Sequence, residues 1–118
     1  MKGKHCMLRL GLIAFLATPV AAQETMPLSD LMTATHVHGI GPGAGGVESL
    51  TLATHNGLWA VDLASGTATR LGQSQDDFMG YSAVPGSPGT AFASGHPATG
   101  GNLGIIRTED AGQTWVRV

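Results

Sequence analysis

Residues Thr108 to Trp115 read T-E-D-A-G-Q-T-W, and they lie between two short strand-like runs. We expect the Asp110 carboxylate to accept hydrogen bonds from nearby backbone N–H groups in an Asx-type turn. Gly112 can supply the positive φ that such a turn usually needs. Trp115 would then direct a large apolar ring away from the turn, where it can pack under a neighbouring sheet. The stretch therefore predicts a structural turn that joins two strands.

The strand-like runs of the whole chain, including the two that flank this turn, fall into two similar units. We expect strands at residues 36–40, 48–55, 58–63 and 67–71 in the first unit, and at 78–84, 89–94, 103–108 and 114–118 in the second. Residues 38–39 correspond to 79–80, and residues 57–59 correspond to 104–106. Four short antiparallel strands in a unit of about 40–50 residues are typical of a β-propeller blade. We therefore predict an all-β chain, a propeller segment with one blade at 35–72 and a second at 73–118.

Two blades do not close a propeller ring, which typically needs at least four. Either the chain is the N-terminal fragment of a longer protein, or several copies assemble into one ring. We favour the fragment, because the sequence stops directly after the strand that follows the turn.

The N-terminal residues have the pattern of a secretory signal peptide over 1–22. Lys2, Lys4 and Arg9 precede a short apolar stretch, and small residues lie before Gln23, where cleavage is expected. Cys6, the one cysteine, lies inside this segment. We expect a periplasmic or secreted protein without disulfides, in which residues 23–34 form a leader with one helical turn ahead of the packed part.

Beyond residue 22 the chain carries three arginines and no lysine against eight acidic residues, a formal charge of −5. Such a balance argues against a nucleic-acid partner and against binding to an anionic membrane surface. The partner is expected to be a small ligand, a glycan or a protein.

Candidate ligand residues gather at one edge of the predicted blades. In an antiparallel blade, the start of the first strand and the end of the second lie at the same edge. The residues placed there are His36, His38, Asp77 and Met79 at the starts of first strands, and His55 and His96 at the ends of second strands. Because first strands are innermost in a propeller, this set would line the rim of the central channel.

Imidazoles together with a carboxylate and a thioether can bind a transition metal. Neutral imidazole suits zinc or copper, and Met79 would favour copper. The alternative is that these histidines are hydrogen-bonded structural residues in loops, and that Asp76 and Asp77 cap a turn. The sequence leaves both interpretations open.

The turn over 108–115 resembles the Asp-box, or BNR repeat, whose pattern is S/T-x-D-x-G-x-T-W. The matching residues are Thr108, Asp110, Gly112, Thr114 and Trp115. The stretches H-V-H-G-I-G, A-T-H-N-G-L, D-F-M-G-Y and S-G-H-P also resemble secreted bacterial BNR/Asp-box propellers, often labelled sialidase-like or glycosylhydrolase-like. The resemblance covers roughly residues 35–118. It implies that the box is a structural hairpin that carries no chemistry itself.

The sialidase label can be compared with the residues present. Sialidases use an arginine triad, a tyrosine–glutamate pair and an aspartate acid. Arg70 and Arg107 fall away from the predicted channel rim, and Tyr81 has no obvious glutamate partner. No catalytic residues are therefore assigned, and the expected role is binding or scaffolding. The alternative is a glycoside hydrolase whose catalytic residues lie in further blades.

Overall fold

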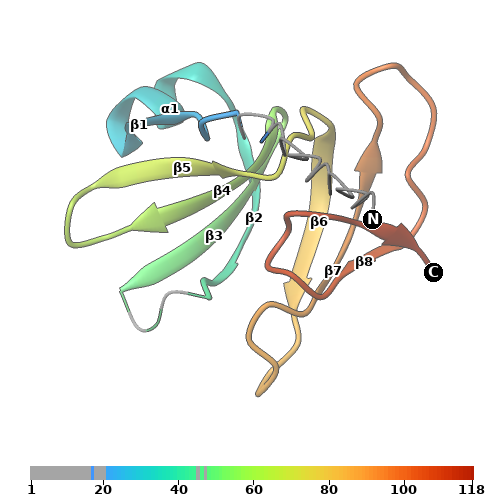
Figure 1. Cartoon of the computed structure of the whole chain (residues 1–118). Helices are drawn as coiled ribbons and strands as arrows, with labels where there is room; N and C mark the ends of the chain where they lie inside the picture. The colour runs from blue at the N-terminus through green and yellow to red at the C-terminus, as the bar shows by residue number, and fades with distance from the viewer. Residues whose placement is uncertain (1–16, 18–20, 45, 47) are drawn as a thin grey trace, which may run out of the picture.

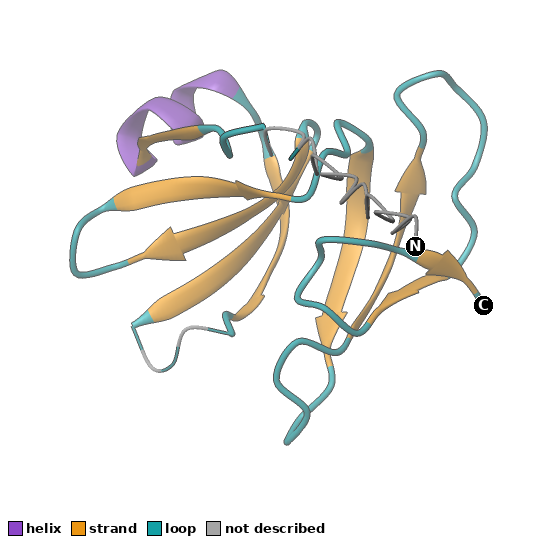
Figure 2. Ribbon diagram, in the orientation of Figure 1, coloured by secondary structure: helices purple, strands orange, loops and turns teal. Residues whose placement is uncertain are grey.

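The computed structural model describes residue 17, residues 21–44, residue 46 and residues 48–118. The predicted signal peptide lies almost entirely outside these residues. The described chain forms two antiparallel sheets and one short helix, α1 (Figure 2). It is thus all-β apart from that helix, as the strand pattern predicted. Within the described residues, no helix is long and apolar enough to cross a membrane.

The first sheet has five strands in the order β1-β5-β4-β3-β2. Their bounds are Thr25–Pro27 for β1, Val37–Pro42 for β2, Ser49–Thr54 for β3, Gly57–Asp62 for β4 and Thr67–Leu71 for β5. His55 and Asn56 form the two-residue turn between β3 and β4. Gly57 follows with φ +86°, and a Cβ there would lie 2.6 Å from the carbonyl oxygen of Ser74. Only glycine fits this position without strain.

The second sheet has four strands in the order β6-β7-β8-β9. Their bounds are Asp77–Ala83 for β6, Ala91–His96 for β7, Ile106–Thr108 for β8 and Val116–Arg117 for β9. β8 and β9 are shorter than the sequence suggested. Gly104 has φ +69°, outside the strand region, so β8 begins only after it. The N–H of Thr114 donates to Asp110 within the turn, so β9 begins later than expected. Ahead of β8, the Arg117 guanidinium donates hydrogen bonds to the carbonyl oxygens of Leu103 and Asn102.

The segment that we expected to be a leader is part of the packed structure. β1 pairs with β5 and extends the first sheet, and the helix α1, Leu28–Ala34, follows directly. Leu31 is 1% exposed and packs in one core cluster with Leu52 and Trp59, residues of β3 and β4. The N-terminal segment therefore covers one face of the first sheet (Figure 1).

This arrangement predicts a large stability cost for Leu31→Ala. Removing a buried leucine side chain lowers the free energy of unfolding by about 2–5 kcal/mol, because a cavity remains. Met32 is the matched control, since it lies in the same helix and is 53% exposed. Urea unfolding should show a clear loss for Leu31→Ala and almost none for Met32→Ala. Equal midpoints for the two variants would mean that α1 does not pack on the sheet.

The opposite face of the first sheet packs against the second sheet. Ala53 and Leu58 from the first sheet form a core cluster there with Phe78, Ala93 and Ile106 from the second. β2 and β6 run side by side at this junction (Figure 1). A Cβ on Gly41 of β2 would lie 2.7 Å from Cε1 of Tyr81 in β6, so glycine permits the close approach. The start of β6 is thereby brought next to the start of β2 and the end of β3.

Candidate metal site at the junction of the two sheets

Three of the residues singled out from the sequence meet where the two sheets join. His38 belongs to β2, His55 to the turn after β3, and Asp77 to the start of β6. Each offers one ligand atom, and these three atoms all lie within 4.8 Å of one another. The cluster thus takes two residues from the first sheet and one from the second.

The distances within the cluster are short. The Nε2 atoms of His38 and His55 are 3.0 Å apart, at hydrogen-bond distance. Nδ1 of His55 lies 2.9 Å from Oδ1 of Asp77, and Nε2 of His38 lies 3.9 Å from the same oxygen. Yet this Oδ1 atom is buried and accepts no hydrogen bond from the described residues. The 2.9 Å separation between Nδ1 of His55 and Oδ1 of Asp77 is therefore a close contact between the two side chains that does not meet the angular requirement of a hydrogen bond.

Hydrogen bonds of the Thr54 hydroxyl and of the backbone fix the turn that carries His55. The Thr54 hydroxyl accepts a hydrogen bond from the backbone N–H of Asn56 at 3.0 Å and donates one to the carbonyl of Gly57 at 2.8 Å. The N–H of Gly57 in turn donates to the carbonyl of Asp76 at 2.8 Å. The turn of the first sheet is therefore tied to the residue next to Asp77, which fixes the positions of His55 and Asp77 relative to each other.

Asp76 has a structural role of its own. Its Oδ1 atom accepts a hydrogen bond from the backbone N–H of Ala98 at 2.8 Å, which ties the start of β6 to the loop after β7. The carboxylate is thus directed at a backbone donor, and Asp77 is the acidic residue that faces the histidines.

The other three candidate ligands lie outside the group of three. The rings of His36 and His55 are neighbours, with centroids 5.4 Å apart. His96 is the register partner of Asp77, but its Nδ1 lies 2.8 Å from the carbonyl oxygen of Gly101, and this hydrogen bond orients its ring. Met79 lies at the β-bulge of β6 and is 45% exposed. The residues brought together are thus two imidazoles and a carboxylate, without the thioether.

The spacing of the group fits a metal ion. In a tetrahedral zinc site with bonds of about 2.0–2.1 Å, neighbouring ligand atoms lie about 3.3 Å apart. The Nε2–Nε2 separation of His38 and His55, 3.0 Å, is about 0.3 Å shorter than this value, and the 3.9 Å from Nε2 of His38 to Oδ1 of Asp77 is about 0.6 Å longer. The third pair of ligand atoms lies within 4.8 Å, so side-chain shifts of about half an ångström or more would bring the three onto one ion. A buried carboxylate oxygen without a hydrogen bond is an expensive group to leave unpaired, and a cation would satisfy it. Imidazole and carboxylate together suit zinc or copper(II).

The turn over 108–115 is built from hydrogen bonds rather than open ligand atoms. The buried Thr108 hydroxyl donates to Oδ1 of Asp110 at 2.8 Å and accepts from the N–H of Gly112 at 2.9 Å. Oδ1 of Asp110 also accepts from the N–H of Thr114 at 2.9 Å. Gly112 has φ +86°, and a Cβ there would lie 2.6 Å from Cδ2 of Leu58. The turn is therefore packed against the first sheet.

Trp115 packs from the end of this turn into the core between the sheets. Its ring lies 5.5 Å from that of Phe78, measured between centroids. The indole N–H is buried and has no hydrogen-bond partner among the described residues. Packing against Phe78 is thus the contact that holds this ring.

The hydrogen bonds of the turn predict a specific response to acid. The Thr114 side chain and, to a smaller extent, the Thr114 backbone N–H donate hydrogen bonds to the Asp110 carboxylate. These hydrogen bonds hold the pKa of Asp110 at about 2, below its ordinary value of 3.8. A lowered pKa means that the ionised form stabilises the fold above the ordinary value, and that this contribution disappears as the pH falls toward 2. The melting temperature of wild type should exceed that of Asp110→Asn by a constant margin from neutral pH to about pH 4, and the margin should then shrink.

Thermal unfolding measured from pH 7 to pH 2 checks this result. Asp62 also has a lowered pKa, because the backbone N–H groups of Ser65 and Ala64 donate to it. It is present in both proteins, so its contribution cancels in the difference. A margin that stays constant down to pH 2 would contradict the role given to the Asp110 carboxylate.

The arginines beyond residue 22 are engaged in structural contacts. Arg70 lies over the Trp59 ring, 4.4 Å from its centroid, and its Nε donates to Oε2 of Glu24 at 2.9 Å. Arg107 pairs with Glu109, and Arg117 binds the backbone carbonyls described above. None of these contacts directs an arginine at the histidine cluster.

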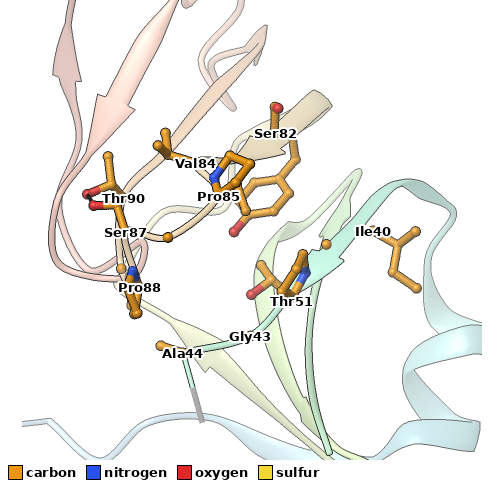
Figure 3. Close-up of a pocket in the computed structure, with 17 residues that line it drawn as sticks. Ile40, Gly43, Ala44, Thr51, Ser82, Val84, Pro85, Ser87, Pro88 and Thr90 are labelled. Atoms are coloured by element: carbon orange, nitrogen blue, oxygen red, sulfur yellow. Dashed lines mark hydrogen bonds between the residues drawn. The ribbon is translucent and has the colours of Figure 1, made fainter. Parts of the chain in front are cut away.

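A cavity of about 460 Å³ lies at the other end of β2 and β6 (Figure 3). It is formed by the turns after the two strands, where Gly43 and Ala44 face Pro85 and Pro88, and by side chains such as Thr51. Sequence reasoning missed it, because glycine and proline runs predict turns and give no sign of how two turns face each other. Every described residue that lines it is uncharged. The histidine cluster is therefore the site with the clearer chemistry.

Comparisons with protein-family models, with curated proteins and with solved structures found no match to this chain.

Proposed function

We propose that this chain is a metal-binding segment of a β-propeller of the BNR/Asp-box kind. In this proposal His38, His55 and Asp77 bind one zinc or copper ion where two blades meet. The observation that carries it is the convergence of three ligand atoms, within 4.8 Å of one another, from both sheets. The buried Oδ1 of Asp77, which has no hydrogen-bond partner among the described residues, adds to this support.

The propeller part of the proposal is supported by the order of the strands. β2 to β5 and β6 to β9 each pair in chain order, apart from the added β1. β2 and β6, the first strands of these two four-strand sets, lie side by side, as innermost strands of consecutive blades do. The proposed ring needs further blades or further copies of the chain.

We propose binding or scaffolding as the role, in the periplasm or outside the cell. Support for export comes from the signal-like residues 1–22, and support for a role without turnover comes from the structural engagement of the arginines. A carboxylate-clamping triad of the sialidase type would need arginines free to face a ligand.

Calorimetric titration tests the proposed function. The untagged chain, stripped with a chelator, is titrated with zinc and separately with copper(II). We expect one ion per chain for at least one of the two metals, with a dissociation constant of about 1 μM or lower, which corresponds to about −8 kcal/mol. His96→Gln is the matched control, since His96 lies outside the group of three, and it should bind like wild type. Absence of saturable binding for both metals would refute the proposal.

A further inference from the structure

We infer that a metal ion held by His38, His55 and Asp77 keeps at least one coordination position open, and that this position takes a small inorganic anion. The inference rests on the proposed function, because it needs the metal to be bound at these three residues. It adds a ligand class to the site: a compact anion that coordinates through a single atom.

The number of ligands is the first argument. Among the described His, Cys, Asp and Glu residues, His38, His55 and Asp77 form the group whose ligand atoms lie within 4.8 Å of one another. Zinc takes four ligands in structural sites, and sites that act on an external molecule typically have three protein ligands and a water in the fourth position. Copper(II) prefers a tetragonal set of at least four. Three protein ligands therefore leave a position open for either metal.

Solvent access is the second argument. The side chains of His38, His55 and Asp77 are 22%, 45% and 26% exposed. A closed structural site would be shielded from water by its own ligands and their neighbours. Oδ1 of Asp77 is itself buried, but His55 is the most exposed of the three, so water and small solutes can approach a bound ion from the His55 side.

Charge is the third argument, and it selects an anion. A divalent ion with two neutral imidazoles and one carboxylate leaves the site with a net positive charge. The nearest other acidic residue along the chain, Asp76, directs its carboxylate to the N–H of Ala98. The neighbouring ring of His36, whose centroid is 5.4 Å from that of His55, can donate a hydrogen bond to a bound anion even when it is neutral. An anion is thus favoured over a neutral or cationic ligand.

The experiment uses copper(II) and azide with the whole chain. Copper is added below one equivalent, so that free metal is scarce, and azide is then titrated while the near-ultraviolet spectrum is recorded. Azide bound to copper(II) gives a charge-transfer band that unbound azide lacks. We expect this band to appear and to saturate. His36→Gln should weaken azide binding by about fivefold, the equivalent of one hydrogen bond of about 1 kcal/mol, without changing copper affinity. His96→Gln should leave azide binding unchanged.

The outcomes separate this inference from the proposed function. Copper binding with no azide band overturns the open position and leaves the metal site standing. Failure of copper to bind overturns both. A band of equal strength in a His38→Gln/His55→Gln variant would show that azide reports on copper bound elsewhere, and this result also overturns the inference.

Discussion

Replacing Trp59 by alanine is expected to lower the free energy of unfolding by about 3–5 kcal/mol, the range for a large buried aromatic residue. Trp59 is fully buried in β4 and packs with Leu31 and Leu52 in the core cluster beneath α1. The change would remove that packing and also the cation–π contact with the Arg70 guanidinium, which lies 4.4 Å from the ring centroid. Domains of this size are stable by only about 5–15 kcal/mol, so the variant should be near the limit of folding.

Trp59→Phe separates packing from hydrogen bonding. Nε1 of Trp59 donates to the carbonyl oxygen of Asn56 at 3.0 Å, and phenylalanine removes this donor. The same oxygen still accepts from Arg70 at 2.7 Å, so it is not left unpaired. The lost hydrogen bond should cost about 1 kcal/mol, and the smaller ring adds a cavity cost that stays below that of Trp59→Ala. Urea unfolding of the two variants checks both values, and a cost below about 1 kcal/mol for Trp59→Ala would contradict the core position.

Local sequence patterns were sufficient to predict most of the strands. The bounds of β5 agree with the expected run at 67–71, and β3 and β4 lie close to the expected runs at 48–55 and 58–63. These features depend on alternation and on turn residues, which act over a few positions. Each sheet also pairs its neighbours in chain order from β2 onward, so local hairpins account for most of the topology.

The N-terminal segment could not be placed in the same way. Leu28 and Leu31 are three residues apart and share one helix face, but a seven-residue helix gives too short a pattern to show that it is packed. Its position depends on β1 pairing with β5, more than 40 residues away, and on Arg70, which pairs with Glu24. Such long-range contacts leave no local sequence pattern.

Strand topology brought the right elements of the candidate site together but could not choose among their side chains. It placed His38, His55 and Asp77 at one edge, where the structure also has them. Met79 was included because it lies near the start of β6, but the β-bulge between Phe78 and Gly80 shifts the register there. His96 was included by its position at the end of β7, but its ring is oriented by the Gly101 carbonyl. Side-chain direction at strand ends depends on such individual contacts.

Replacing His38 and His55 together by glutamine is expected to reduce metal affinity by about 100-fold or more. Residues that only support metal ligands already cost about 10–100-fold when they are changed, so losing two ligands should cost at least the upper value. Glutamine keeps a polar side chain of similar length, and Asp77 remains in place. Titration of zinc and copper(II) into the metal-free variant measures the loss.

The matched control for this variant is His36→Gln/His96→Gln, which removes the same number of histidines and keeps the group of three intact. It should retain wild-type metal affinity, and an equal loss in the two double variants would mean that the metal binds to exposed histidines in general.

A second measurement uses the position of the site between the sheets. His38 and His55 belong to the first sheet and Asp77 to the second, so a bound ion opposes their separation. At a metal concentration 100 times the dissociation constant, binding should stabilise wild type by about 2.7 kcal/mol. Thermal unfolding with and without metal should show this increase for wild type and for the control pair, and almost none for His38→Gln/His55→Gln. Because the lost stabilisation follows from the lost affinity, the two measurements must agree if one ion joins the two sheets.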